Sequence, residues 1–310
     1  MTTSQTNPVL VLGGTGTVGS RIAKQLSAAS VPALAASRNG TGADGVVFDW
    51  EDRKTWENPF KAAAKASSKG RDEATGNTSG SSRIKSVFLL APPVLDSAPI
   101  MMEFVDFARQ RGARRFVLLS ASAIEAGEPA MGKVHAYLRE LGCRGEVDWA
   151  VLRPTWFQQN VAEQEGHVRS LREESKLYSA TGEGKIPWVS ADDIAAVAVQ
   201  ALTRKDPPNT EFVILGPQLL SYDDLAEILT ELLGRKIVHV DLSTRDLEER
   251  HQSLGMPENY ARMMSSLDNA IKVGSENRVN DVVLSVTGRA PKPFREFAES
   301  VKSVWEPAVA

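Results

Sequence analysis

The sequence predicts an α/β fold in which a doubly wound parallel sheet is followed by a smaller carboxyl-terminal lobe. Three observations support this: short apolar runs alternate with helical patterns, a glycine cluster ends the first run, and helical segments dominate after Arg153. Strands that alternate with helices in this way are typical of βαβ units. We expect the sheet within residues 1–155 and the lobe within 156–310, with residues at about 186–216 returning to the sheet.

The glycine cluster joins the first strand to the first helix. Gly13 and Gly14 permit a tight turn, Gly16 lets the backbone approach a pyrophosphate, and Gly19 lets the helix pack closely on the strand. The helix points its unpaired N–H groups at the phosphates. A glycine turn that binds nothing is the alternative, but the strand and helix around the cluster favour a Rossmann-type dinucleotide site. The expected cofactor contacts of this turn are Gly13, Gly14, Thr15, Gly16, Thr17, Val18 and Gly19.

The second strand, residues 31–37, completes the first βαβ unit and indicates which dinucleotide binds. NAD-binding proteins usually place an acidic residue at its end, whereas this chain has Ser37 and Arg38 there. The guanidinium of Arg38 offers a planar fork of donors that suits a 2'-phosphate. We therefore predict NADPH rather than NADH, with a solvated loop charge as the alternative for Arg38.

A third strand over residues 45–50 is expected to end near the adenine. Asp49 can accept a hydrogen bond from the adenine amino group, and Trp50 can flank the ring or serve only in packing. Ala91, Pro92 and Pro93, at the end of the fourth strand, are expected to run past the ribose and pyrophosphate, although they could form an ordinary turn.

The later elements follow the same rhythm. Further strands are expected at 84–90, 115–120, 148–153 and 211–215, with helices at 100–111, 133–141 and 192–203. The lobe is expected to hold helices at 222–233, 243–254 and 258–272 and an extended piece at 236–240. Residues 67–82 are polar and rich in glycine and serine, which predicts a mobile surface insertion that carries no chemistry.

Composition excludes several classes of function. The 310 residues include 36 lysines and arginines against 39 acidic residues, so the formal net charge is −3 and nothing invites nucleic acid or an anionic membrane. One cysteine, Cys143, allows no disulfide within the chain. No apolar run reaches the length of a membrane span and the first residues lack an apolar signal segment, so a cytoplasmic protein is expected. The four histidines show no ligand spacing, so no metal site is expected.

Several segments together resemble the NmrA-like group of atypical short-chain dehydrogenases, and more closely its fungal ergot alkaloid reductases, the festuclavine and agroclavine dehydrogenases. The likeness covers nearly the whole chain except residues 67–82. The glycine cluster is generic, whereas the stretches 129–133 and 155–157 are more particular. The segments that carry the likeness are 13–19, 118–122, 129–133, 152–160, 185–195, 234–237 and 255–261.

The resemblance implies further site residues. Lys133 matches the lysine of the Tyr-x-x-x-Lys pair and would hydrogen-bond the ribose hydroxyls, unless it is a surface lysine. Ser120 and Ser122 end the fifth strand near the nicotinamide ribose, although serines at a strand end often serve only as capping groups. The backbone of Pro154 could contact the carboxamide. Met131, Trp156 and Phe157 are expected at the substrate, with the two aromatic residues as a wall for a flat indole, although core packing is equally expected of them.

The tyrosine of that pair is absent, because Pro129 occupies its position. Proline cannot donate a proton, and Tyr137 lies on the wrong side of the lysine to replace the tyrosine, so no catalytic residue is assigned with certainty. An iminium carbon needs no proton donor, because its nitrogen already carries the positive charge and hydride addition gives a neutral amine.

The resemblance thus implies an NADPH-dependent reductase of the cyclic iminium formed from chanoclavine-I aldehyde, a small indole alkaloid, with festuclavine or agroclavine as product. An upstream reductase of the pathway is the expected partner, since an earlier isomerisation decides which clavine forms. Two alternatives stay open: a non-enzymatic dinucleotide sensor of the NmrA type, which the loss of the tyrosine favours, and an NADPH-dependent quinone or enone reductase.

Overall fold

The computed structural model describes residues 7–42, 44–68 and 83–306. The chain divides into two compact units. Unit 1 runs to Pro154 and regains Ile194–Val213, whereas unit 2 holds Thr155–Asp193 and Ile214–Ala310.

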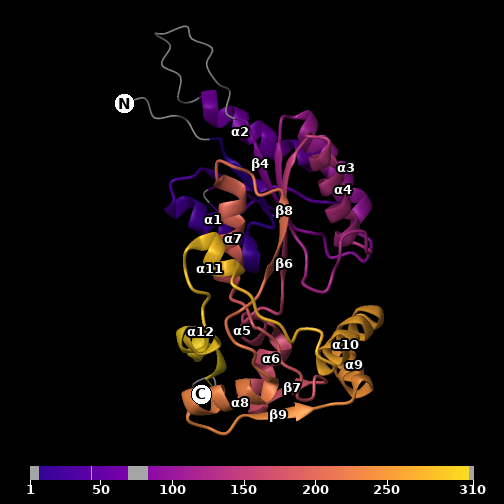
Figure 1. Cartoon of the computed structure of the whole chain (residues 1–310), viewed down its shortest axis with the longest axis vertical. Coiled ribbons are helices and arrows are strands. Elements are labelled where there is room, and N and C mark those ends of the chain that lie inside the picture. Colours follow the sequence, from indigo (N-terminus) through magenta and orange to yellow (C-terminus); the bar gives the residue numbers. More distant parts are fainter. Residues whose placement is uncertain (1–6, 43, 69–82, 307–310) are drawn as a thin grey trace. The chain divides into compact units, whose positions relative to one another are not determined.

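Unit 1 is built on a seven-stranded sheet with the strand order β3-β2-β1-β4-β5-β6-β8 (Figure 1). Its strands pair in parallel register, as between Leu10 and Leu34 on one side of β1 and Leu10 and Val87 on the other. The order reverses between β1 and β4, which confirms the predicted doubly wound Rossmann-type sheet. The strands are β1 (Val9–Leu12), β2 (Ala33–Ser37), β3 (Gly45–Val47), β4 (Ser86–Leu89), β5 (Arg115–Leu119), β6 (Asp148–Pro154) and β8 (Thr210–Ile214).

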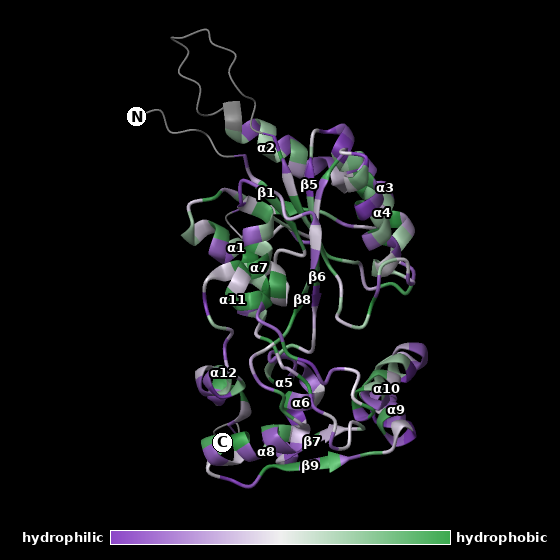
Figure 2. Cartoon of the chain, in the orientation of Figure 1, coloured by the Kyte–Doolittle hydropathy of each residue, from purple (hydrophilic) through white to green (hydrophobic). Residues whose placement is uncertain are grey.

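Apolar side chains fix this sheet between its helices. All of β1 is buried, because parallel strands with both faces covered must be apolar throughout. Helix α7 is also strongly apolar and is largely green in Figure 2. The helices of unit 1 are α1 (Thr17–Ala28), the 3-10 helix η1 (Arg53–Glu57), α2 (Asn58–Ser68), α3 (Ala98–Gln110), α4 (Met131–Cys143) and α7 (Ala191–Thr203), which starts in unit 2.

Unit 2 has a separate core around Trp188, Tyr222, Phe294 and Trp305. Its two-stranded sheet pairs β7 with β9 in parallel, an arrangement that the sequence reading of 236–240 did not include. The elements of unit 2 are α5 (Asn160–Glu163), α6 (Glu165–Arg169), the π-helix η2 (Ser170–Glu174), β7 (Lys176–Ser179), α8 (Tyr222–Leu233), β9 (Val238–Asp241), α9 (Thr244–Ser253), α10 (Glu258–Lys272), α11 (Val282–Thr287), α12 (Phe294–Val301) and η3 (Lys302–Trp305).

Two expected segments differ from the structure. Strand β3 ends at Val47 rather than at residue 50, because the Asp49 carbonyl accepts hydrogen bonds from the Thr55 hydroxyl and the Trp56 indole and so turns the chain into η1. Of the predicted insertion at 67–82, Ser67 and Ser68 belong to α2, and the rest lies outside the described residues.

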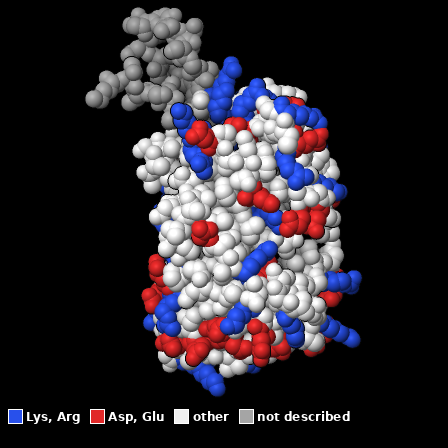
Figure 3. Space-filling view, in the orientation of Figure 1, with Lys and Arg blue, Asp and Glu red and all other residues white. Residues whose placement is uncertain are grey.

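Both signs of charge occur on the face of the molecule shown in Figure 3, with acidic residues gathered toward its lower end. On the face shown in Figure 3, lysines and arginines lie among acidic residues, consistent with the net charge of −3. Within the described residues, no helix is both long and apolar enough to span a bilayer.

Candidate cofactor site

The glycine turn between β1 and α1 has the geometry of a phosphate cradle. Gly13 adopts φ +67°, a conformation that favours glycine. A Cβ on Gly19 would lie 2.2 Å from the carbonyl oxygen of Gly13, so only glycine lets α1 start this close to the turn. The Gly16 N–H closes the turn on that same carbonyl at 2.9 Å.

The amino end of α1 is open to an anion. Gly16 is its N-cap, no side chain caps the helix, and its first turn contains no acidic residue. The first N–H groups of a helix have no acceptor within the helix, and its dipole is positive there. A Cβ on Gly16 would meet no atom closer than 3.4 Å, so the protein itself leaves the space over this residue open.

A pocket of about 310 Å³ lies beside this turn, at the carboxyl ends of β1, β2 and β4. Ligands of open α/β sheets bind at this edge, where the strand order reverses. The pocket brings together many residues that the sequence predicted at the cofactor, and adds Glu51, which the sequence reading did not single out. The pocket is lined by Gly13, Thr15, Gly16, Ala36, Ser37, Arg38, Phe48, Asp49, Trp50, Glu51, Leu90, Ala91, Pro92 and Pro93.

Arg38 has the features that a phosphate-binding arginine needs. Its side chain is exposed at the pocket and has no hydrogen-bond or ion-pair partner among the described residues. Ser37 beside it accepts a hydrogen bond from the Gly40 N–H at 3.1 Å. The guanidinium is therefore available to a ligand, whereas Ser37 also shapes the loop.

Trp50 and Asp49 combine ligand-facing and structural positions. Trp50 lines the pocket, and its ring also packs edge-on against Phe48 and Phe104, with centroid separations of 5.2 Å and 5.3 Å. The Asp49 carboxylate accepts the Glu51 N–H at 3.0 Å. The two roles considered for Trp50, packing and ligand contact, are therefore compatible for one side chain.

The other predicted cofactor residues of unit 1 lie outside that pocket. Ser120 and Ser122 follow β5, and their N–H groups donate to the carbonyls of Leu152 and Pro154 on β6 at 2.7 Å and 2.8 Å. The Ser120 hydroxyl is buried without a hydrogen-bond partner in the described structure. A buried polar atom without a partner is costly, so this hydroxyl fits a position that a bound ligand completes. Gly14, Thr17, Val18, Gly19, Lys133 and Pro154 are also not among the residues that line the pocket.

The start of α4 carries Lys133 and is locally strained. Ala130, its N-cap, adopts φ 54° and ψ −118°, which L-residues rarely do. Lys133 is exposed on the first turn of the helix, and Met131 is half-buried against the core of unit 1.

Tyr137 is engaged elsewhere. Its hydroxyl donates to Asp106 Oδ1 at 2.6 Å, and burial together with this hydrogen bond raises the pKa of Tyr137 to about 12. The phenol is thus a poor proton donor at neutral pH, in keeping with its interpretation as an aromatic residue on the helix face.

Unit 2 contains the remaining predicted residues. Trp156 packs partly into its core, and its carbonyl accepts the Val189 N–H at 3.0 Å. Phe157 forms a parallel β-bridge with Val189. Thr155 donates to the buried carboxylate of Glu276 at 2.9 Å, a pairing across 121 residues that no local pattern could reveal.

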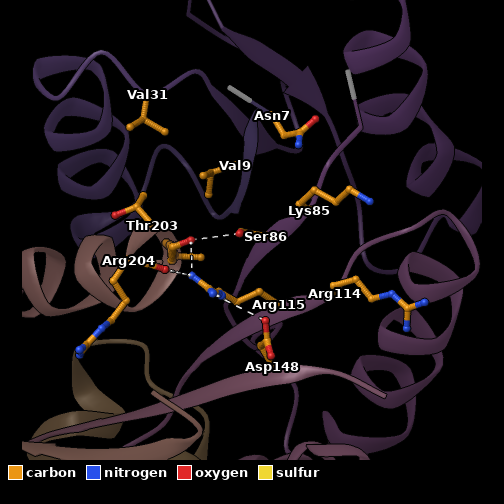
Figure 4. Close-up of a pocket in the computed structure, with 11 residues that line it drawn as sticks. Asn7, Val9, Val31, Lys85, Ser86, Arg114, Arg115, Asp148, Thr203 and Arg204 are labelled. Atoms are coloured by element: carbon orange, nitrogen blue, oxygen red, sulfur yellow. Dashed lines mark hydrogen bonds and ion pairs between the residues drawn. The ribbon is translucent and has the colours of Figure 1, made fainter. Parts of the chain in front are cut away.

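A second pocket in unit 1, of about 340 Å³, lies at the opposite, amino edge of the sheet (Figure 4). Arg115 occupies its centre and donates to the carbonyls of Leu202 and Arg204, at 3.3 Å and 2.7 Å, and pairs with Asp148 at 3.6 Å. Ser86 also donates to the Leu202 carbonyl, at 3.0 Å. These groups hold the carboxyl end of α7 on the sheet, so the pocket is polar mainly for structural reasons.

No metal centre was found in the part of the chain that the structure describes, since no group of three or more histidine, cysteine or acidic side chains could hold an ion there. The glycine turn, the start of α1 and the pocket where the strand order reverses together have the geometry of a dinucleotide cradle. These features define an NAD(P)-binding Rossmann-type protein.

Comparison with known proteins gives the family. The family described as NAD(P)H-binding matches residues 13–205. Festuclavine synthase II of Penicillium roqueforti is 44% identical over 96% of this chain and 99% of its own length, and agroclavine dehydrogenase of Claviceps fusiformis is 41% identical over 96% and 98%. The triphenylmethane reductase of Citrobacter, solved with NADP(H), shares the fold with a TM-score of 0.72 at 19% identity, over 95% of this chain and 99% of that one.

The chain belongs to the NAD(P)H-binding family, and within it to the group that contains the festuclavine synthases and agroclavine dehydrogenases. This confirms the resemblance that its motifs indicated.

Proposed function

We propose that the protein is an NADPH-dependent reductase of a cyclic iminium in clavine alkaloid biosynthesis. The iminium forms when the secondary amine of chanoclavine-I aldehyde condenses with the aldehyde of the same molecule and water leaves. Addition of a hydride to the iminium carbon gives the neutral amine, festuclavine or agroclavine. The names of the relatives support the substrate class.

One observation carries the proposal of an iminium rather than a carbonyl substrate. Pro129 stands where a short-chain dehydrogenase has its proton-donating tyrosine, and the nearest other phenol, Tyr137, is hydrogen-bonded to Asp106. Reduction of a carbonyl leaves an alkoxide that needs a proton, whereas reduction of an iminium does not. A site in which proline replaces this tyrosine therefore suits a substrate whose reduction requires no proton donor.

The residues of the chain bind and orient, and bound NADPH supplies the hydride. We assign the pyrophosphate to the glycine turn and the amino end of α1, and the 2'-phosphate to Arg38. Ser120, Ser122 and Lys133 are assigned to the nicotinamide ribose, and the backbone of Pro154 to the carboxamide. Met131, Trp156 and Phe157 are assigned to the substrate, where an aromatic face stabilises a nearby cation by about 0.5 to 2 kcal/mol.

The test is NADPH consumption, followed by its nicotinamide absorbance, with chanoclavine-I aldehyde and then with a simple quinone, and identification of the product by mass spectrometry. The proposal expects oxidation of NADPH with the aldehyde and a product one hydride heavier than the iminium, whose protonated form lies two mass units above the iminium cation. Oxidation with the quinone alone would instead identify a quinone reductase.

A dinucleotide sensor is the second candidate, because Pro129 also suits a protein that performs no reduction. Tight binding of the coenzyme without turnover of either acceptor would identify a sensor. A stable protein that binds neither NADPH nor NADP+ would refute all three candidate functions: iminium reductase, quinone reductase and dinucleotide sensor.

A further inference from the structure

Arg153, the residue before Pro154 on β6, has an environment that the sequence did not reveal. Its side chain is only 3% exposed, and its guanidinium has hydrogen-bond partners on two separate segments of unit 1, the loop between β5 and α4 and strand β8. It donates to the carbonyls of Ala121 at 3.5 Å and Ser122 at 2.9 Å, to Glu211 Oε2 at 2.7 Å, and to both carboxylate oxygens of Glu125, at 2.9 Å for Oε2.

Arg153 is charged in this environment. Burial lowers the pKa of Arg153, but hydrogen bonds with Glu125 and Glu211 raise it more, so the pKa lies above its ordinary value. Stability alone does not explain such a group, since a buried ion pair often contributes no more than a well-packed apolar residue would. The guanidinium of an arginine has five donors in a fixed planar arrangement, so it can hold its acceptors in a defined geometry.

The geometry that it defines is that of the loop between β5 and α4. Arg153 holds the loop at its start, through the two carbonyls, and at Glu125. The Glu125 backbone then meets α4: a Cβ on Gly132 would lie 2.4 Å from the Glu125 carbonyl oxygen, and the Gly127 N–H donates to the Gly132 carbonyl at 2.7 Å. The position of Glu125 therefore fixes the first turn of α4.

That loop begins at Ser120 and leads into Lys133. One end presents the buried hydroxyl that has no hydrogen-bond partner among the described residues, and the other presents the lysine on the first helical turn. Both residues are assigned above to the same ribose. A shift of the loop would move them relative to each other without changing either side chain.

We propose that Arg153 and Glu125 form a clamp that positions Ser120 and Lys133 for the nicotinamide half of the coenzyme. The clamp contributes nothing to the adenine half, which the glycine turn and Arg38 hold on other strands. Arg153 is a positioning residue, because it acts through the loop rather than on the coenzyme. The inference rests on the cofactor site proposed above.

The experiment compares two ligands. NADPH carries both halves of the coenzyme, whereas adenosine 2',5'-bisphosphate carries only the adenine half. Affinities of both are measured by calorimetry for the full chain and for Glu125→Gln and Arg153→Lys, together with thermal unfolding. Glu146→Gln, which weakens the ion pair of Glu146 with Arg109 elsewhere in unit 1, is the matched control.

We expect Glu125→Gln to weaken NADPH binding by about tenfold, the effect of losing a hydrogen bond between charged groups, with little change for the bisphosphate. Arg153→Lys should weaken NADPH at least as much, since an ammonium cannot donate to all of these acceptors. Glu146→Gln should leave both affinities at the level of the unaltered protein.

The proposal is overturned if folded Glu125→Gln binds NADPH as the unaltered protein does, or if both ligands weaken equally. If Arg153→Lys fails to fold, Glu125→Gln still tests the proposal, because the Glu125 side chain is exposed. Failure of the iminium proposal would leave this comparison intact, because it requires no turnover. Failure of the cofactor site would be seen separately, as loss of binding in the unaltered protein.

Discussion

The two edges of the sheet in unit 1 each have a pocket with polar groups in its lining, yet they differ in what these polar groups do. At the amino edge, Arg115 and Ser86 both donate to the Leu202 carbonyl in the last turn of α7 (Figure 4). At the carboxyl edge, Arg38 has no partner among the described residues, the Ser120 hydroxyl is buried without one, and α1 begins without a cap.

Hydrogen-bonding groups that have no protein partner therefore identify the ligand site better than the volume or the polarity of a pocket does. The amino-edge pocket is slightly the larger, at about 340 Å³ against about 310 Å³, and several basic residues line it. However, Arg114 donates to the Glu146 carbonyl, and the Arg204 side chain points away from Arg115 (Figure 4). Donors that already have protein acceptors have little to offer a ligand.

The largest expected effect is that of Gly16→Asp at the carboxyl edge. An aspartate is a favourable N-cap and the backbone of Gly16, at φ −83° and ψ 176°, accommodates it, so α1 should be slightly more stable. The same carboxylate would repel a pyrophosphate and fill the space above the turn. We expect calorimetry to show NADPH affinity reduced by about 100-fold or more while the melting temperature is unchanged or higher.

Gly16→Ala serves as the control for this variant, since it adds volume without charge and should weaken binding less. Equal NADPH affinity in Gly16→Asp and the unaltered protein would show that the phosphates do not bind at the amino end of α1.

Arg38→Asp should have the next largest effect. Loss of a charge-assisted bidentate contact and the addition of a like charge should weaken NADPH by about 10- to 100-fold, while NADH affinity changes by less than about threefold. Titration of both coenzymes measures the selectivity directly. Equal weakening of the two would mean that Arg38 does not read the 2'-phosphate.

Arg115→Met tests the amino edge with the opposite pair of readouts. The side chain is 12% exposed, and its removal takes a donor from the Leu202 and Arg204 carbonyls and the ion-pair partner from Asp148, although Ser86 still donates to Leu202. Urea unfolding should show a stability loss of about 1 to 3 kcal/mol. NADPH affinity should remain within about twofold, and a larger change would break the distinction between the two edges.

Pro129→Tyr should have the smallest effect. If the reaction needs no proton donor, restoring the tyrosine should leave the rate of iminium reduction within about twofold. Steady-state turnover with chanoclavine-I aldehyde measures it, with thermal unfolding to verify that the loop before α4 is intact. A substantial gain in rate would indicate that the absence of a proton donor limits the reaction of the unaltered protein. The assignment of an iminium substrate would then need revision.

Local patterns predicted most of the fold but only part of the site. The strands of unit 1 and the glycine turn could be predicted because their signals lie within a few adjacent residues, as in Val9–Leu12 followed by Gly13. The β7–β9 pair was missed because short half-exposed strands carry little signal until their partner is known.

Contacts between distant residues could not be predicted in the same way. Arg153 meets Glu125 and Glu211, which lie 28 and 58 positions away, and nothing near Arg153 in the sequence indicates either. Trp50 shows a different limit, since an aromatic residue after a strand predicts packing or ligand contact equally well and here lies where it can do both.

That double position of Trp50 makes the indole an internal optical reporter. Its ring lines the pocket while it touches Phe104 and lies 6.3 Å from Trp56, so a molecule that enters beside it changes the polarity around one fluorophore and its coupling to another. Tryptophan emission should thus register occupancy of the adenine end without any added label, and Trp50→Phe should silence that signal while the pocket stays filled.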